Sequence, residues 1–174
     1  MALINQEVLF EITPIRSGGN QTEFEKISFK PFFETISDRF SPNWEGQKDI
    51  GRADSRWMYA EFNRYLNISF KVIAEGDDLP KAKDAFKKLN ALAKATYPYY
   101  TDGKGFSGVF IKFTIGGLYK NEFGFINSLD YDWDNNVIWD LEDQLPMYTT
   151  ANLSITYIGK VRPDLGYGVN PFSI

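Results

Sequence analysis

Several segments of this chain alternate apolar and polar residues with a period of two. The clearest are residues 66–72 and 109–115, in which every second residue is Leu, Ile, Val or Phe. Because successive side chains of a strand point to opposite faces of a sheet, this pattern predicts strands with one buried face. The same rule predicts strands through residues 8–12, 125–133 and 153–157. We therefore expect a mainly β protein of the α+β class.

One segment follows the 3.6-residue period of a helix instead. Its apolar residues predict a helix with one buried face over about residues 79–97, and this helix would flank the sheet. Asp77 or Asp78 is positioned to cap the first turn, in which Pro80 is tolerated. Pro98 is expected to end the helix, since the residue before a proline avoids helical geometry.

Three segments rich in Gly, Ser, Asn, Pro or Asp are predicted loops: Ser17 to Gln21, Ser41 to Asp54 and Thr101 to Gly108. The middle segment is longer than about 12 residues, a length that is usually functional in a compact domain, so it is a candidate contact loop. Residues 1–160 are expected to form a single domain, and residues 161–174 an extended C-terminal arm.

The 174 residues include 15 Phe, 10 Tyr and 4 Trp but no Cys and no His. Their absence excludes disulfides, thiol nucleophiles, imidazole acid–base catalysis and zinc sites built from these residues. We therefore expect no enzymatic activity, no catalytic residue and no cofactor. The N-terminus lacks the basic and apolar regions of a signal peptide. No segment approaches the roughly 20 apolar residues of a membrane helix, so we expect no membrane partner.

Charge is segregated along the chain, although the net charge is only −4. No basic residue occurs between Lys120 and Lys160, where seven acidic residues lie, whereas the predicted helix is rich in lysine. A net charge of this size and sign does not indicate a nucleic-acid-binding protein, which would carry an excess of basic residues. Segregated charge suits subunits that meet head to flank or a surface that repels a polyanion, and it equally suits an ordinary solvated surface.

Asp130, Asp132 and Asp134 have the spacing of the first three ligands of a calcium-binding loop. Position 6 of that loop is Asn135 where a Gly is needed, and position 12 is Leu141 where a Glu should bind the ion. We therefore predict no metal site here.

The same residues instead predict a hairpin over 129–141 with its turn at 134–136. In its first strand, Asp130 and Asp132 would point away from the face that carries the apolar residues. Asp132 and Asp140 could then face each other as the carboxylate pair of a glycosidase, but solvated charges explain them equally well.

The order of short motifs along the chain resembles that of a known family. In chain order these motifs are Val8 to Arg16, Phe40 to Trp44, Gly51 to Asp54, Asn67 to Ala74, Lys87 to Asn90, Tyr97 to Tyr100, Gly124 to Tyr131 and Leu145-Pro146. From about residue 7 to 160, the chain resembles the tube-initiator and tube-cap proteins of contractile bacteriophage tail baseplates, relatives of the tail tube protein.

The resemblance implies a sandwich-like or barrel-like antiparallel tail tube fold and a structural role in the virion, after synthesis in the host bacterial cytoplasm. Such proteins form hexameric rings with the helix outside and a channel for genome passage inside. The implied partners are further copies of the chain, the tail tube protein and the baseplate hub protein, with the tape measure protein as a further candidate. Passing DNA would not be bound sequence-specifically. Some relatives carry a LysM module, and the end of the chain at Ile174 favours the tube initiator over those.

The resemblance also implies where contacts would lie. Candidate lumen-facing acidic residues are Asp130, Asp132 and Asp134. Candidate contacts with a neighbouring ring or subunit are Trp44, Gly51, Arg52 and Asp54. Edge strands of adjacent subunits would pair to close the ring.

Two alternatives lie within the same class: the tail tube protein itself and a tube terminator. A carbohydrate-binding β-sandwich is the alternative from another class, since Trp44, Trp57, Trp133 and Trp139 could stack on sugar rings. Each of these tryptophans is equally explained as a core residue. A carboxylate-based glycosidase is a third alternative.

Overall fold

A computed structural model describes residues 8–16, 22–73, 82–101, 105–134, 136–139, 144–159 and 172. Several features predicted above lie outside these residues: the Ser17 to Gln21 loop, the helix-capping residues, Asp140 and, apart from Phe172, the C-terminal arm.

The expectation of a mainly β protein with a flanking helix is confirmed. In chain order the elements are β1 (Phe10–Arg16), β2 (Thr22–Glu23), β3 (Ile27–Phe29), β4 (Phe32–Lys48), β5 (Ser55–Ile73), α1 (Ala82–Lys94), β6 (Tyr99–Thr101), β7 (Gly105–Ser107), β8 (Val109–Ile115), β9 (Tyr119–Asp132) and β10 (Tyr148–Ile158).

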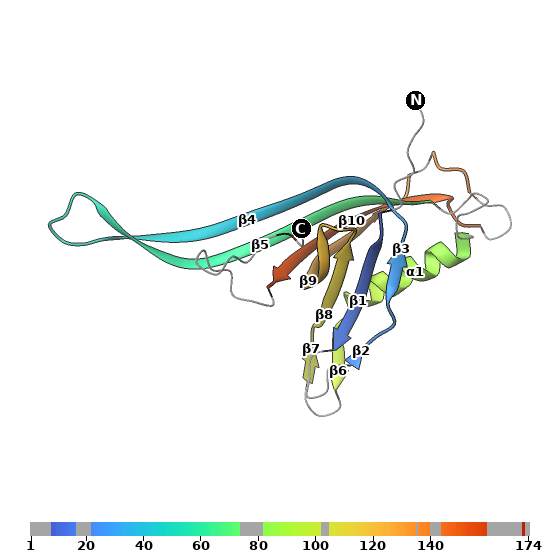
Figure 1. The fold of residues 1–174 in the computed structure, drawn as a ribbon, viewed down its shortest axis with the longest axis horizontal. Coiled ribbons are helices and arrows are strands. Elements are labelled where there is room, and N and C mark those ends of the chain that lie inside the picture. Colours follow the sequence, from blue (N-terminus) through green and yellow to red (C-terminus); the bar gives the residue numbers. More distant parts are fainter. Residues whose placement is uncertain are drawn as a thin grey trace.

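An eight-stranded antiparallel sheet forms most of the molecule. Its strand order is β2-β1-β8-β9-β10-β5-β4, with β3 pairing to β1 beside β2, while β6 and β7 form a separate small hairpin. Figure 1 shows α1 beside β3, and the long β4–β5 hairpin projecting away from the rest of the molecule.

The alternating residues bury one face of the sheet, as predicted. The core residues that lie on strands at the predicted parity are Phe10, Ile12, Leu66, Ile68, Phe70, Val72, Ile111, Phe113, Ile115, Leu153 and Ile155. Phe10 and Phe70 meet edge to face with ring centroids 5.2 Å apart, and Phe29 and Phe33 contact both rings. Such aromatic pairs stabilise a core beyond the area that they bury.

Helix α1 covers this buried face through Ala85, Leu89 and Leu92, which are all buried. The hydroxyl of Tyr131 donates a hydrogen bond to the carbonyl oxygen of Leu89 at 2.8 Å. Phe86 stacks on Trp133 at a centroid distance of 5.5 Å. The helix is therefore held to β9 and to the residues that follow it.

The predicted C-terminal end of the helix, near residue 97, is wrong. The α-helix ends at Lys94, and the amides of Thr96 and Tyr97 bond to carbonyl oxygens three residues back, as in a tighter turn. Tyr97 is exposed, whereas Ala95 takes the buried position. Residues 79–81 lie outside the described part.

Two predicted loops contain strands. Residues 41–48 continue β4, and residues 101 and 105–107 belong to the β6–β7 hairpin. Turn-forming residues are tolerated there because each strand pairs with one neighbour only among the described residues.

The predicted hairpin over 129–141 is also wrong. The end of β9 pairs with β10, so that Asp132 lies opposite Thr150 rather than Asp140. The turn itself forms, since the Val137 amide bonds to the Asp134 carbonyl. Between the turn and β10, the described residues form an isolated bridge between Trp139 and Pro146 in place of a return strand.

We predict that Gly124→Ala destabilises the fold. A methyl group at Gly124 would lie 2.5 Å from the carbonyl oxygen of Thr156 and 2.8 Å from Cγ2 of Ile155, on the neighbouring strand. Overpacking of this kind costs about 1–3 kcal/mol, measurable by urea denaturation. Gly117→Ala is the matched control, because nothing lies within 4 Å of its added methyl group. Equal stability of the two variants would contradict this packing.

Candidate functional site

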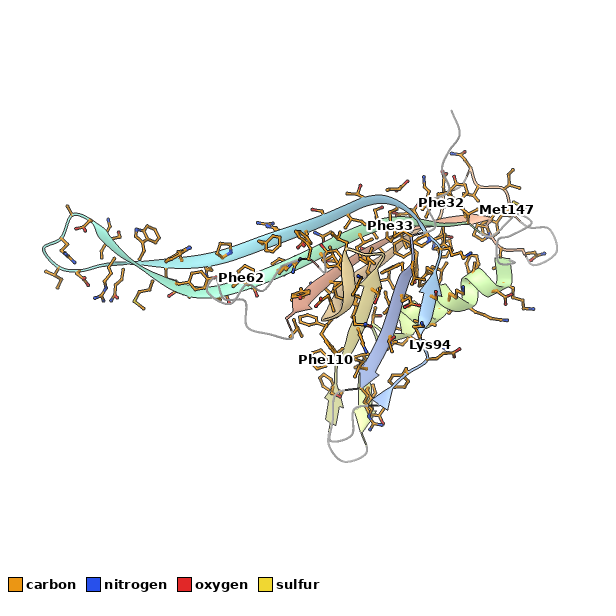
Figure 2. All side chains as sticks on the ribbon, in the orientation of Figure 1. Phe32, Phe33, Phe62, Lys94, Phe110 and Met147 are labelled. Atoms are coloured by element: carbon orange, nitrogen blue, oxygen red, sulfur yellow. The ribbon has the colours of Figure 1, made fainter. Side chains whose placement is uncertain are left out.

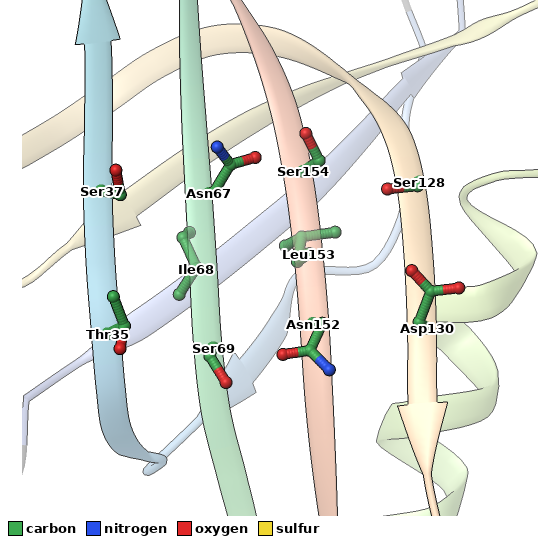
Figure 3. Close-up of a pocket in the computed structure, with 10 residues that line it drawn as sticks. All are labelled: Thr35, Ser37, Asn67, Ile68, Ser69, Ser128, Asp130, Asn152, Leu153 and Ser154. Carbon is green, nitrogen blue, oxygen red and sulfur yellow. The ribbon is translucent and has the colours of Figure 1, made fainter.

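The sheet face turned away from α1 carries small polar side chains (Figure 3). Two rows of cross-strand neighbours run over β4, β5, β10 and β9. The first row is Ser37, Asn67, Ser154 and Ser128. The second row is Thr35, Ser69, Asn152 and Asp130. These eight residues, which we call the polar face, surround a shallow hollow of about 210 Å³.

Ion pairs and hydrogen bonds continue along this side of the sheet beyond the second row. Lys71 Nζ lies 2.7 Å from Glu34, and this hydrogen bond is the main cause of a lowered pKa of the Glu34 carboxyl. Asn152 Nδ2 donates to Asp132 at 2.7 Å. Charged groups here are therefore largely engaged with neighbours, while the eight residues of the polar face include one charge, Asp130.

Two of the three acidic residues predicted to face a lumen lie on one face of β9. Asp130 belongs to the polar face, and Asp132 lies two residues further along the strand on the same side of the sheet. Asp134 follows the end of β9, where it accepts hydrogen bonds from the Asn136 amide and the Tyr148 hydroxyl. Among the described residues, no group of three acidic side chains is placed to hold a metal ion.

The second candidate surface is the outer part of the β4–β5 hairpin. β5 pairs with β10 only as far as Tyr65, so residues 40–64, which we call the arm, form a ribbon of two strands. Figures 1 and 2 show it extending beyond the sheet, with side chains projecting into open space towards its tip.

Aromatic residues follow one another along the arm and contact each other in pairs. Trp44 meets Tyr59 edge to face at 5.0 Å, and Phe40 lies 6.4 Å from Phe62. The ring of Trp57 lies across Gly46, where a methyl group would touch it at 3.0 Å. We call the aromatic residues of these pairs, together with Trp57, the arm stripe. Trp44 and Trp57 remain 55% and 63% exposed.

The tip of the arm holds three of the four predicted contact residues. Gly51 adopts a φ of 87°, a left-handed conformation that favours glycine. The Arg52 amide bonds to the Asp49 carbonyl, and its guanidinium lies 4.0 Å from Asp54. Trp44 is not in this turn but within β4, so the predicted contact loop is a strand followed by a tight turn.

None of the four tryptophans is a core residue, contrary to one of the two explanations considered for them. Trp133 and Trp139 are 47% and 51% exposed, and the other two lie on the arm. Sequence reasoning missed the arm because Pro42 and Gly46 interrupt its apolar pattern. The run of Trp57, Met58 and Tyr59 was the signal that could have identified it.

A third exposed apolar area lies around the small hairpin. Tyr100 and Phe106 pair at 6.2 Å and are each more than 70% exposed. Nearby, an apolar groove of about 340 Å³ lies between the end of α1 and the sheet, lined by Pro14, Phe24, Ile27, Ala95, Tyr97 and Val109 among others.

None of the family models searched and none of the curated proteins matches the chain. In the described part of the chain, no helix has the length and apolar character needed to cross a membrane.

We predict that backbone amides of the arm exchange with solvent at least about tenfold faster than those of residues 66–72 in the same strand. A two-stranded ribbon without a third strand is only marginally stable, so it opens without global unfolding. Hydrogen exchange followed by mass spectrometry on dilute protein measures this ratio, with the central strand β8 as the protected reference. Equal protection of the arm and residues 66–72 would contradict the prediction.

Proposed function

We propose that this chain is a structural virion protein that assembles as a homohexameric ring at a phage tail baseplate, starts the tail tube and lines part of its DNA channel. The observation that carries the proposal is the polar face: eight small polar residues on one side of a sheet whose other side is buried. The resemblance of the motif order to tube initiators supports it.

The polar face suits the wall of a channel through which DNA moves. Proteins hold DNA without regard to sequence mainly by placing Lys and Arg against phosphates. The two rows offer no cation, and Asp130 would repel phosphate. Lys71, which lies close by, is paired with Glu34. Small polar side chains keep such a wall hydrated, and without an unpaired cation in the two rows the wall offers DNA phosphates no binding site.

The ends of the sheet suit closure of a ring. β4 pairs with β5 and with no other strand among the described residues, which leaves a 17-residue edge. Exposed edges of this length invite pairing with another chain, and monomeric proteins usually protect them. Pairing of the part of β4 that lies in the sheet, residues 32–39, with the β2–β3 end of the next copy would join the two ends of the sheet in every copy of a closed ring.

The arm and the groove suit contacts between successive rings. The arm stripe exposes aromatic rings on a ribbon with no core of its own, and exposed apolar patches of this kind mark interaction surfaces. In this proposal the arm contacts the neighbouring ring or subunit, with Trp44 and the tip residues Gly51, Arg52 and Asp54 at the contact. The apolar area near α1 is available to the hub or the first tube ring.

The direct test is cryo-electron microscopy of the purified full chain, alone and with the hub and tube proteins of the same phage. We expect sixfold rings with Asp130 on the inner wall. A chain that stays monomeric with both partners present, or rings with Asp130 on the outer wall, would contradict the proposal. A stable monomer that binds glycans would support the carbohydrate-binding alternative.

We predict that Asp130→Lys gives the rings an affinity for DNA that the wild-type rings lack. Lysines on an inner wall converge on one enclosed strand, so we expect affinity for single-stranded DNA to rise at least about tenfold at low salt and to fall steeply as salt is added. Fluorescence anisotropy of a labelled oligonucleotide measures both effects.

The matched control is Asp84→Lys, which adds the same charge to α1, on the outer wall of the proposed ring. Lysines on the outer wall point away from one another and do not act on one strand together, so we expect the affinity for single-stranded DNA to rise less than about threefold. An equal gain in both variants would place Asp130 outside the channel.

A further inference from the structure

The arm leaves the sheet at a buried ion pair. The Arg64 guanidinium binds both carboxylate oxygens of Asp38, with Nε 3.0 Å from Oδ1, and the two side chains are 5% and 11% exposed. The hydroxyl of Tyr119 donates to Asp38 Oδ2 at 2.7 Å. Such a forked pair fixes both the distance and the orientation of its partners.

Four aromatic rings surround the Arg64 guanidinium: Phe40 and Tyr157 at 4.6 and 4.5 Å, and Tyr119 and Phe172 at 5.6 Å, each measured to the ring centroid. We call these four residues the Arg64 cage. Cations over aromatic faces are attracted most where water is excluded. Phe172 also contacts Tyr119 edge to face at 6.0 Å, so it forms part of the wall.

The cage joins the arm to parts of the chain that are remote in sequence. Asp38 and Arg64 belong to β4 and β5, and Arg64 is the first residue of β5 beyond its pairing with β10. Tyr119 begins β9, and Tyr157 lies near the end of β10, where its hydroxyl donates to Glu122 at 2.7 Å. Phe172 comes from the C-terminal segment. The root of the arm is thus attached to two further strands and to that segment.

A two-stranded ribbon bends and twists readily, because no third strand limits it. Contacts at its root therefore decide which way it points. An apolar contact allows sliding, whereas the Arg64–Asp38 pair would lose its three hydrogen bonds and leave buried charge if the arm rotated.

We propose that Arg64 is the positioning residue that sets the direction of the arm relative to the sheet, and that Phe172 completes the cage that holds it. The inference rests on the proposed function in one respect, namely that the arm is the element that docks on a neighbouring ring or subunit. A fixed direction would place the arm stripes of all copies in matching positions before docking.

The test measures the distance between the arm and the body of the molecule. The chain contains no Cys, so Ala53→Cys at the tip and Asn90→Cys on α1 accept two spin labels without a background. Pulsed electron–electron double resonance, with labelled protein diluted into unlabelled protein, gives the distribution of distances between the two labels of one chain. We expect a single narrow distribution.

Arg64→Lys keeps the charge but removes the fork, and Phe172→Ala removes one wall of the cage. We expect each to widen the distribution at least about twofold. Arg56→Lys is the matched control, since Arg56 lies on the same strand but is exposed, and it should leave the width unchanged. A merely stabilising role would lower the melting temperature without changing the width.

Unchanged width in both cage variants would overturn the proposal. If the distance distribution widens in Arg64→Lys but not in Phe172→Ala, the role proposed for Phe172 is overturned and the role of Arg64 stands. If Arg64→Lys does not fold, Asp38→Asn, which removes the charge that the fork binds, takes its place. The measurement does not require ring assembly, so a chain that forms no ring but depends on Arg64 for its arm direction loses the proposed function and keeps this inference.

Discussion

Packing of one sheet face against α1 determines what the other face can be. Ile68, Leu153 and Leu129 lie opposite one another on β5, β10 and β9, with their side chains on the core side. Because side chains alternate, the residues on either side of each must project the other way. The two polar rows therefore follow from the register that buries the core, and a slip of one residue would expose the core and bury the polar rows.

This coupling explains why sequence reasoning succeeded for the central strands. The alternation in residues 66–72 is the same property that buries them, so pattern and outcome share one cause. The helix was found for the same reason, since Ala85, Leu89 and Leu92 follow the period of its buried face. Its end was misplaced because the spacing continues to Tyr97, while the backbone tightens after Lys94.

Apolar–polar alternation indicates which face of a strand is buried, but it does not indicate which strand pairs with it. The pattern after Asp134 is compatible with a strand that returns along β9. The structure instead pairs β9 with β10, which is formed further along the chain by residues 148–158. The arm escaped prediction for a different reason. It covers no core, and its register shifts between Asn43 and Trp44, so no single parity runs through it. The Asp38–Arg64 pair joins residues 26 positions apart, and only the paired hairpin brings them together.

The ion pair at the arm root has a consequence for the register of the whole hairpin. Asp38 lies opposite Leu66 and Arg64 lies opposite Phe40, so the two charged residues are diagonal neighbours on one face. A shift of one residue between the strands would send them to opposite faces and leave buried charge unpaired, which costs several kcal/mol. Aromatic contacts along the arm tolerate such a shift better, because these rings are largely exposed and the loss of their contacts leaves no buried charge. A long ribbon whose own contacts are permissive thus takes both its register and its direction from the polar contact at its base.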